Sequence, residues 1–291
     1  MLTVTAPATS ANLGSGFDVF GVAFERPLDV VRVERAPETT IEVTGVGSQY
    51  IPTDPERNTA GVVAAEMGTP ARIEIDKGVR PASGLGSSAA SAAAAAVALS
   101  ELYDTGHTRE ELVWIAAEGE AAVSGSAHAD NVAPAILGGF TVVRADGVES
   151  VDATVPLVAC LPETVVSTRE ARQVLPEQVD LSAMTETVGN AATLTIGMQR
   201  DVTELIGQGM REAVVKTAGA ALIDGYDEAV AAAKDAGATG VTVSGAGPAL
   251  LAVTRPGKRR AVAAAMVEAF ESVDIEARTF KTMIGSGATI H

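Results

Sequence analysis

The sequence is poor in cysteine, lysine and aromatic residues, and it has no long uninterrupted apolar run. Its 291 residues include a single cysteine, so no disulfide can form within the chain. Cys160 lies in an apolar run, which indicates a buried structural thiol rather than a nucleophile. The alanine-rich run from Ala89 to Leu99 stops at Ser100, short of the roughly 20 apolar residues of a membrane span. The first residues lack the basic segment and apolar core of a signal peptide. We therefore expect a cytoplasmic protein with no membrane partner.

Positive charge is also scarce. The chain carries 21 Lys and Arg, only five of them Lys, against 37 Asp and Glu, for a formal net charge of −16. A nucleic-acid partner requires a basic patch, so this balance argues against one. The acidic residues are scattered rather than clustered. Diffuse acidity with few lysines and 3% aromatic residues is typical of a protein from a high-salt cytoplasm. The charge pattern thus bears on habitat rather than on activity.

Strand and helix patterns alternate along the whole chain. The first strand patterns cover residues 2–6, 28–34 and 41–44. The second half alternates strands with helices, and the longest helix is predicted over 181–206. The length and an apolar content of 47% are sufficient for two domains. We expect an α+β fold with an N-terminal domain over 1–150 and a C-terminal domain over 151–291, in which helices cover one face of a sheet.

A glycine-rich segment leads into the alanine-rich helix. It reads Pro81, Ala82, Ser83, Gly84, Leu85, Gly86, Ser87, Ser88, Ala89, Ala90 and Ser91. The two glycines let the backbone approach an anion closely, and the free N–H groups and dipole of a helix start attract phosphate. No Lys follows the second glycine, so this is not a Walker A loop, and the spacing of the dinucleotide fingerprint is absent. The alternative is an ordinary loop with a helix N-cap.

Three segments together resemble the motifs of a known superfamily. They are Pro7–Asp18, Pro81–Ser91 and Ser244–Pro248, and they span nearly the whole chain. Their types and order are similar to those of the galactokinase, homoserine kinase, mevalonate kinase and phosphomevalonate kinase (GHMP) superfamily. The Asn-Leu-Gly-x-Gly-Phe-Asp form of the first motif resembles the homoserine kinase branch.

This resemblance implies a fold, a reaction and its partners. The fold would have a left-handed β-α-β crossover in an N-terminal domain similar to a domain of a ribosomal protein, followed by a ferredoxin-like C-terminal domain. The reaction would be ATP- and Mg²⁺-dependent phosphorylation of the L-homoserine hydroxyl, a step of threonine biosynthesis. The sequence is compatible with a homodimer. Two alternatives stay open: a kinase of another small hydroxy acid, and a catalytically silent relative that binds a nucleotide or metabolite as a regulator.

The resemblance also assigns roles at the nucleotide end. Ser88 and Glu120 would hold the metal ion, with Glu118 as the competing carboxylate. The loop over 81–91 would bind the phosphates. Asn58 matches a position that contacts the adenine, and its alternative role is an ordinary helix N-cap. The turn over 245–248 would approach the active-site face, or simply connect two strands.

Further roles fall at the acceptor end. The substrate-binding positions are Asn12, Asp18, His128, Thr168 and Arg172. The catalytic positions are Asn12, Glu120, Asp130 and Asn131. Homoserine kinases are thought to work by positioning, without a dedicated base. Asp130 is the one carboxylate that we would test as a base.

One position departs from the family pattern. Homoserine kinases usually carry an arginine that binds the substrate carboxylate, and Gly219 stands at that place here. Loss of a charged hydrogen bond typically costs about 1.5–3 kcal/mol. Lys216 lies one helical turn earlier and offers a replacement charge.

The Lys216 hypothesis gives a first prediction. If this ammonium binds the acceptor carboxylate, Lys216→Ala raises the KM for homoserine roughly 10-fold or more, the loss expected for one charged hydrogen bond. The KM for ATP stays the same. Steady-state kinetics with each substrate varied in turn measures both constants, and an unchanged homoserine KM would exclude the compensation.

Overall fold

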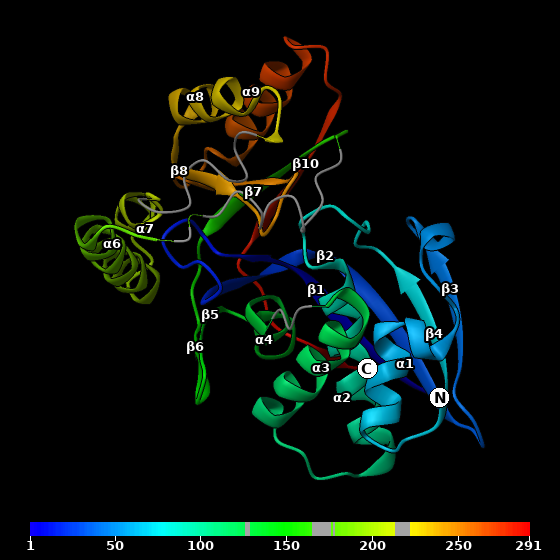
Figure 1. The fold of residues 1–291 in the computed structure, drawn as a ribbon. Coiled ribbons are helices and arrows are strands. Elements are labelled where there is room, and N and C mark those ends of the chain that lie inside the picture. The colour runs from blue at the N-terminus through cyan, green and yellow to red at the C-terminus, as the bar shows by residue number, and fades with distance from the viewer. Residues whose placement is uncertain (126–128, 165–175, 177, 213–221) are drawn as a thin grey trace.

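The part of the chain that the structure describes forms two β-sheets, and each has its own set of helices (Figure 1). The computed structural model describes residues 1–125, 129–164, 176, 178–212 and 222–291. Helices and strands are mixed in both parts, which confirms the predicted α+β class. The predicted domain boundary at residue 150 lies one residue before the end of β6 (Gly147–Val151), a strand of the first sheet.

The first sheet has seven strands. They are β1 (Leu2–Ala11), β2 (Phe20–Arg35), β3 (Thr40–Gly45), β4 (Ala71–Lys77), β5 (Phe140–Arg144), β6 (Gly147–Val151) and β11 (Thr289–Ile290). The order is β11-β1-β2-β4-β3, with β5 on β2 and β6 on β5. Among the strands of the described residues in this sheet, only β3 and β4 pair in parallel. The chain between them forms α1 (Thr59–Glu66) after two short 3₁₀ turns, Ser48–Tyr50 and Pro55–Arg57. This is the expected β-α-β unit, and its left hand stays a prediction.

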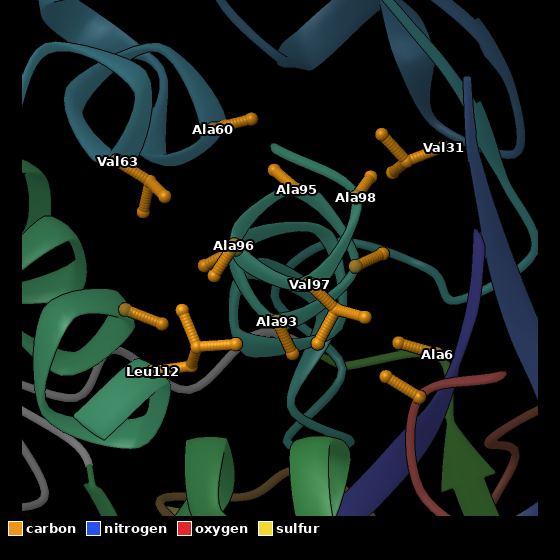
Figure 2. Packing of buried hydrophobic residues seen from close by; sticks show 14 of the residues in the cluster. Ala6, Val31, Ala60, Val63, Ala93, Ala95, Ala96, Val97, Ala98 and Leu112 are labelled. Atoms are coloured by element: carbon orange, nitrogen blue, oxygen red, sulfur yellow. The ribbon is translucent and has the colours of Figure 1, made fainter. Parts of the chain in front are cut away.

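A helix of small residues, α2 (Ser87–Tyr103), runs through the centre of this part. All eleven residues from Ala89 to Leu99 are buried, so every side of the helix faces protein. It packs between β1 and β2 on one side and α1, α3 (Arg109–Ser124) and α4 (Ala129–Leu137) on the other. Figure 2 shows its alanines pointing toward neighbours such as Val31 of β2 and Val63 of α1. Alanine has the highest helix propensity and lets these neighbours approach closely.

The second sheet is antiparallel, with the order β10-β7-β9-β8. Its strands are β7 (Pro156–Pro162), β8 (Ala238–Val243), β9 (Leu250–Thr254) and β10 (Ala277–Met283). This order is that of a ferredoxin-like β-α-β-β-α-β unit, as expected. Two helices, α8 (Tyr226–Ala236) and α9 (Arg259–Glu271), cover one face.

The expected helix layer on one face of this sheet is confirmed by α8 and α9, and the second face has a cover of its own. Every residue of β7 and of β9 is buried, so both faces need a cover. Leu157 and Leu251 point away from α8 and α9 and share a core with Phe24 of β2. Leu194 of α6 (Leu181–Gln199) and Ile206 of α7 (Thr203–Gly209) belong to the same core. The second face therefore joins the two halves of the chain.

The single helix predicted over 181–206 is divided in two. The helix α6 ends at Gln199, and α7 starts at Thr203. Between them Asp201 has a φ of 52°, a left-handed conformation that a right-handed helix cannot include. The Asp201 carboxylate accepts a hydrogen bond of 2.6 Å from the N–H of Thr154. A contact with a distant segment thus stabilises a break that the local apolar pattern does not reveal.

Other sequence expectations concern burial. Cys160 on β7 is fully buried, and burial raises the pKa of its thiol to about 12, as expected for a structural residue. Among the helices in the described ranges, none combines the length and apolar character that a membrane crossing requires.

Candidate active site

The three sequence motifs meet at the loop that precedes α2. The carbonyl of Leu85 in this loop accepts a hydrogen bond of 3.1 Å from the N–H of Thr9 in the first motif. The carbonyl of Gly84 accepts one of 2.7 Å from the hydroxyl of Ser244 in the third motif. The same hydroxyl lies 2.8 Å from that of Ser10. Segments more than 200 residues apart are therefore tied to one loop.

Both loop glycines are required by close contacts and by backbone conformation. Gly86 has a φ of 62°, and a Cβ atom there would lie 1.9 Å from Oγ1 of Thr9. Gly84 has a φ of 77°, and a Cβ atom there would lie 2.7 Å from the carbonyl oxygens of Ser244 and Gly247. Any larger residue would separate the three motifs.

The start of α2 presents backbone donors without a protein cap. Gly86 is the N-cap and has no side chain to accept from the first turn, and no other side chain of the described residues caps it. The hydroxyl of Ser87 points back and donates to the carbonyl of Val79 at 2.7 Å. The N–H groups of the first turn, together with the helix dipole, are therefore available to an anion.

Ser88 and Glu120 lie together beside this helix start. The Ser88 hydroxyl donates to Oε2 of Glu120 over 3.0 Å, from α2 to α3. Glu120 is 3% exposed, whereas Glu118 is exposed. The structure therefore brings Glu120 to the loop and leaves its competitor at the surface.

The environment of Glu120 favours its neutral form. Burial raises the pKa of this carboxyl from 4.5 to about 7. The Ser88 hydrogen bond and the Lys77 charge lower this pKa, while the Asp130 charge raises it further. Desolvation therefore dominates in the protein without a metal ion.

The donor set fits a Mg²⁺ ion that is shared with a nucleotide. Within the described ranges, no group of three or more His, Cys, Asp and Glu side chains is arranged to hold a metal by itself. Mg²⁺ is usually bound by one or two carboxylates together with substrate phosphates. The Ser88 hydroxyl and the Glu120 carboxylate, which lie 3.0 Å apart, could form the protein part of such a set.

The first turn of α4 approaches the same loop. Oδ1 of Asn131 accepts a hydrogen bond of 2.9 Å from Oγ1 of Thr9, and it would lie 3.0 Å from a Cβ atom on Gly86. Asp130 is buried, and its charge acts on Glu120. Asn131 therefore lies at the loop, and the Asp130 carboxylate lies beside it, with its Oδ1 3.4 Å from Nδ2 of Asn131.

Asn12 connects the first motif to the third. It has a φ of 72°, its Nδ2 donates to the carbonyl of Gly245 over 3.1 Å, and its Oδ1 accepts from the N–H of Asp18 over 2.9 Å. The Asp18 side chain is exposed. The two predicted substrate residues are thus neighbours at the junction of the two halves.

Asn58 is the N-cap of α1. Its Oδ1 accepts from the N–H of Ala60 over 3.0 Å, and its Nδ2 donates to the carbonyl of Pro52 over 2.7 Å. The side chain is 4% exposed. The capping role is confirmed, and the adenine contact stays a prediction.

Several predicted residues lie outside the described residues. These are His128, Thr168, Arg172, Lys216 and Gly219. The acceptor end of the site is therefore described only through Asn12, Asp18, Asp130 and Asn131.

Sequence reasoning missed a buried ion pair under the loop. Lys77 at the end of β4 pairs with Asp29 of β2, and both side chains are almost fully buried. The signal was present, because alternation along β4 places Lys77 on the same face as Ile73 and Ile75. A charge on a buried face needs a partner.

Comparison with known proteins identifies the family. A model of the GHMP kinases N-terminal domain matches residues 57–139, and a model of the GHMP kinases C-terminal domain matches residues 197–272. The homoserine kinase of Natronomonas pharaonis is 65% identical over 290 residues, which cover 100% of both chains. That of Methanocella arvoryzae is 49% identical and covers 99% of this chain and 97% of its own. The chain belongs to the GHMP kinase family, in its homoserine kinase branch.

Solved structures agree with this membership. The GHMP kinase fold found here matches the crystal structure of homoserine kinase from Cytophaga hutchinsonii with a TM-score of 0.90 at 34% identity, over 100% of this chain and 97% of that one. The mevalonate kinase of L. major in complex with R-mevalonate matches with a TM-score of 0.76 at 17% identity, over 97% and 95%. The latter likeness concerns the fold alone.

The raised pKa of Glu120 gives a prediction on stability in this GHMP kinase. Between pH 4.5 and 7 the folded protein keeps a proton on Glu120 that the unfolded chain releases. The unfolding free energy therefore falls as the pH rises through this range, by up to about 3 kcal/mol from this group. In Glu120→Gln that contribution is absent.

Urea unfolding in concentrated KCl without divalent metal measures this difference. Glu118→Gln is the matched control, because its exposed carboxyl lies on the same helix, and it should keep the wild-type slope. A Glu120→Gln protein with the wild-type pH dependence would contradict the assignment.

Proposed function

We propose that this protein transfers the γ-phosphoryl group of ATP to the side-chain hydroxyl of L-homoserine and releases ADP and O-phospho-L-homoserine. The observation that carries the proposal is the Ser88–Glu120 pair, which lies beside an uncapped helix start where all three motifs meet. A homoserine kinase 65% identical over the full chain supports the choice of acceptor.

Phosphoryl transfer depends mainly on positioning and on neutralising charge. The first-turn N–H groups of α2 bind the β- and γ-phosphates in this proposal. Ser88 and Glu120 hold Mg²⁺, which when bound neutralises charge on those phosphates. Asn58 borders the adenine from the start of α1, and the remaining loop residues shape the backbone around the phosphates.

The acceptor binds opposite the phosphates. Homoserine is oriented so that its hydroxyl oxygen faces the γ-phosphorus. The side chains that orient it are Asn12, Asp18, His128, Thr168 and Arg172. Asn131, which lies at the loop, and its neighbour Asp130 contact the reacting end in this proposal. The hydroxyl attacks directly in this proposal, without a dedicated base, and Asp130 is the one carboxylate that we would test for that role.

The pathway, habitat and partners of the enzyme are part of the same proposal. We propose that the product serves threonine biosynthesis and that the enzyme works in the cytoplasm of a salt-loving organism, as a monomer or homodimer without nucleic-acid or membrane partners. The net charge of −16 and the source of relatives such as Haloquadratum walsbyi support this setting.

An acceptor panel tests the activity. In concentrated KCl with MgCl₂, ADP release is measured with L-homoserine, L-serine, L-threonine, mevalonate or no acceptor, and ³¹P NMR identifies the product. We expect fast ADP release only with L-homoserine, and a phosphomonoester signal. Turnover only with another acceptor, or binding of ATP without turnover, would contradict the proposal.

Variants at the metal pair test the site. Glu120→Gln removes a charged metal ligand and should lower kcat/KM by roughly 100-fold or more, as for other groups that stabilise transition-state charge. Ser88→Ala should raise the Mg²⁺ concentration needed for half-maximal rate. Glu118→Gln should behave as wild type, and an active Glu120→Gln enzyme would rule out this carboxylate as the ligand.

A further inference from the structure

Lys77 contacts the first turn of α2 from the side of the first sheet. Its Nζ donates to the carbonyl oxygen of Ser87 over 2.6 Å and to Oγ of Ser91 over 2.8 Å, and it pairs with the Asp29 carboxylate. Lys77 is 2% exposed and belongs to β4, whereas both serines belong to α2. One side chain thus joins the sheet to the helix start.

Asp29 completes this network on the side of β2. Its Oδ1 accepts from the N–H groups of Gly78 and Val79, both over 3.0 Å, and its Oδ2 accepts from Ser91 over 2.8 Å. The carboxylate therefore fixes the chain where it leaves β4 for the loop. The loop is held at its beginning by Asp29 and at its end by Lys77.

The contacts exclude a direct phosphate-binding role for Lys77. An ammonium group has three donors, and here they meet three acceptors: Asp29, Ser87 and Ser91. The charge is also balanced by Asp29 at close range. Burial lowers the pKa of Lys77, while the Asp29 carboxylate raises it. Lys77 thus differs from the lysine of a Walker A loop, whose ammonium reaches the phosphates.

The effect of Lys77 on the site runs through one peptide group. The carbonyl of Ser87 and the N–H of Ser88 belong to the same planar trans peptide, so they point in opposite directions. A hydrogen bond that fixes the Ser87 oxygen therefore also fixes the direction of the Ser88 N–H. That N–H belongs to the uncapped first turn, and Ser88 also donates to Glu120.

We infer that the Lys77–Asp29 pair is a positioning element for nucleotide binding, which orients the Ser87–Ser88 peptide so that the Ser88 N–H and hydroxyl face the phosphates and the metal ion. This inference rests on the proposed function of the loop. It assigns roles to two residues that touch neither the nucleotide nor the acceptor.

The test compares Lys77→Met, Asp29→Asn and the double variant. Lys77→Met alone leaves a buried carboxylate without its counter-charge and should lower the melting temperature strongly. In the double variant both groups are neutral, and the amide oxygen introduced by Asp29→Asn still accepts from the N–H groups of Gly78 and Val79, so folding recovers. The hydrogen bond to the Ser87 carbonyl stays absent.

Calorimetric titration with MgADP and steady-state kinetics in concentrated KCl provide the readouts. We expect the double variant to bind MgADP roughly 10–100-fold more weakly than wild type and to show a similar rise in the KM for ATP, the range seen when supporting residues behind a ligand are removed. The KM for homoserine should stay within about twofold. If nucleotide affinity returns to wild type together with the melting temperature, the pair has only a structural role and the inference fails.

Two controls separate the possible failures. Ile73 lies in the core on β4, the strand that carries Lys77, so Ile73→Val should lower stability without changing nucleotide affinity. Gly86→Ala forces the loop away from Thr9 and should weaken MgADP binding. If Gly86→Ala keeps wild-type affinity, the loop is not the nucleotide site and the proposed function of the loop fails as well. If Gly86→Ala loses affinity and the double Lys77 and Asp29 variant does not, only the positioning inference fails.

Discussion

The N–H groups in the first turn of a helix need partners from capping side chains, water or a ligand, and the first turn of α2 is open at Ser87 and Ser88 and has no side-chain cap from Gly86. Its alanines let α1, α3, α4 and the first sheet close around it, so its axis is fixed from every side. At its N-terminus, Gly86 supplies no side chain to cap the first turn. The loop, the third motif and the first motif then pack against this end rather than cover it. The fold thus delivers a fixed set of donors to the junction of the two halves.

Hydrogen-bond donors at the loop contribute more to nucleotide binding than the net charge of the chain does. ATP is an anion, and a chain with a net charge of −16 repels it at long range. In concentrated salt the screening length falls to about 3 Å, so that distant acidic residues matter little. Contacts at hydrogen-bond distance are screened far less. A site built from backbone N–H groups, one hydroxyl and one buried carboxylate is therefore compatible with an acidic surface. The raised pKa of Glu120, about 7, fits the same pattern, because burial leaves the carboxyl partly protonated at neutral pH and a bound cation would favour its charged form.

The sequence predicted what depends on local pattern or on motif resemblance. The α+β class and the helix after Gly86 follow from residue order, and the structure agrees with both. The choice of Glu120 over Glu118 follows from the motif resemblance; Glu120 does lie against Ser88, and its role as metal ligand stays a prediction. The division of the 181–206 helix could not be predicted, because Asp201 is held by Thr154, which is distant in sequence. The cover on the second face of the second sheet could not be predicted either. Every residue of β7 and β9 is buried, and this burial on both faces results from packing against distant parts of the chain. Lys77 and Asp29 were visible as charges within apolar strand patterns, but only their pairing shows that they act on one loop.

In the proposed function, the first turn of α2 binds the nucleotide phosphates through its backbone N–H groups. Hydrogen exchange of the backbone amides, followed with and without MgADP in concentrated KCl, tests it most directly. We predict that bound MgADP slows exchange at residues 86–89 more than anywhere else in α2, because those N–H groups then donate to phosphate oxygens. Unchanged exchange at these amides in a protein that demonstrably binds MgADP would contradict the account.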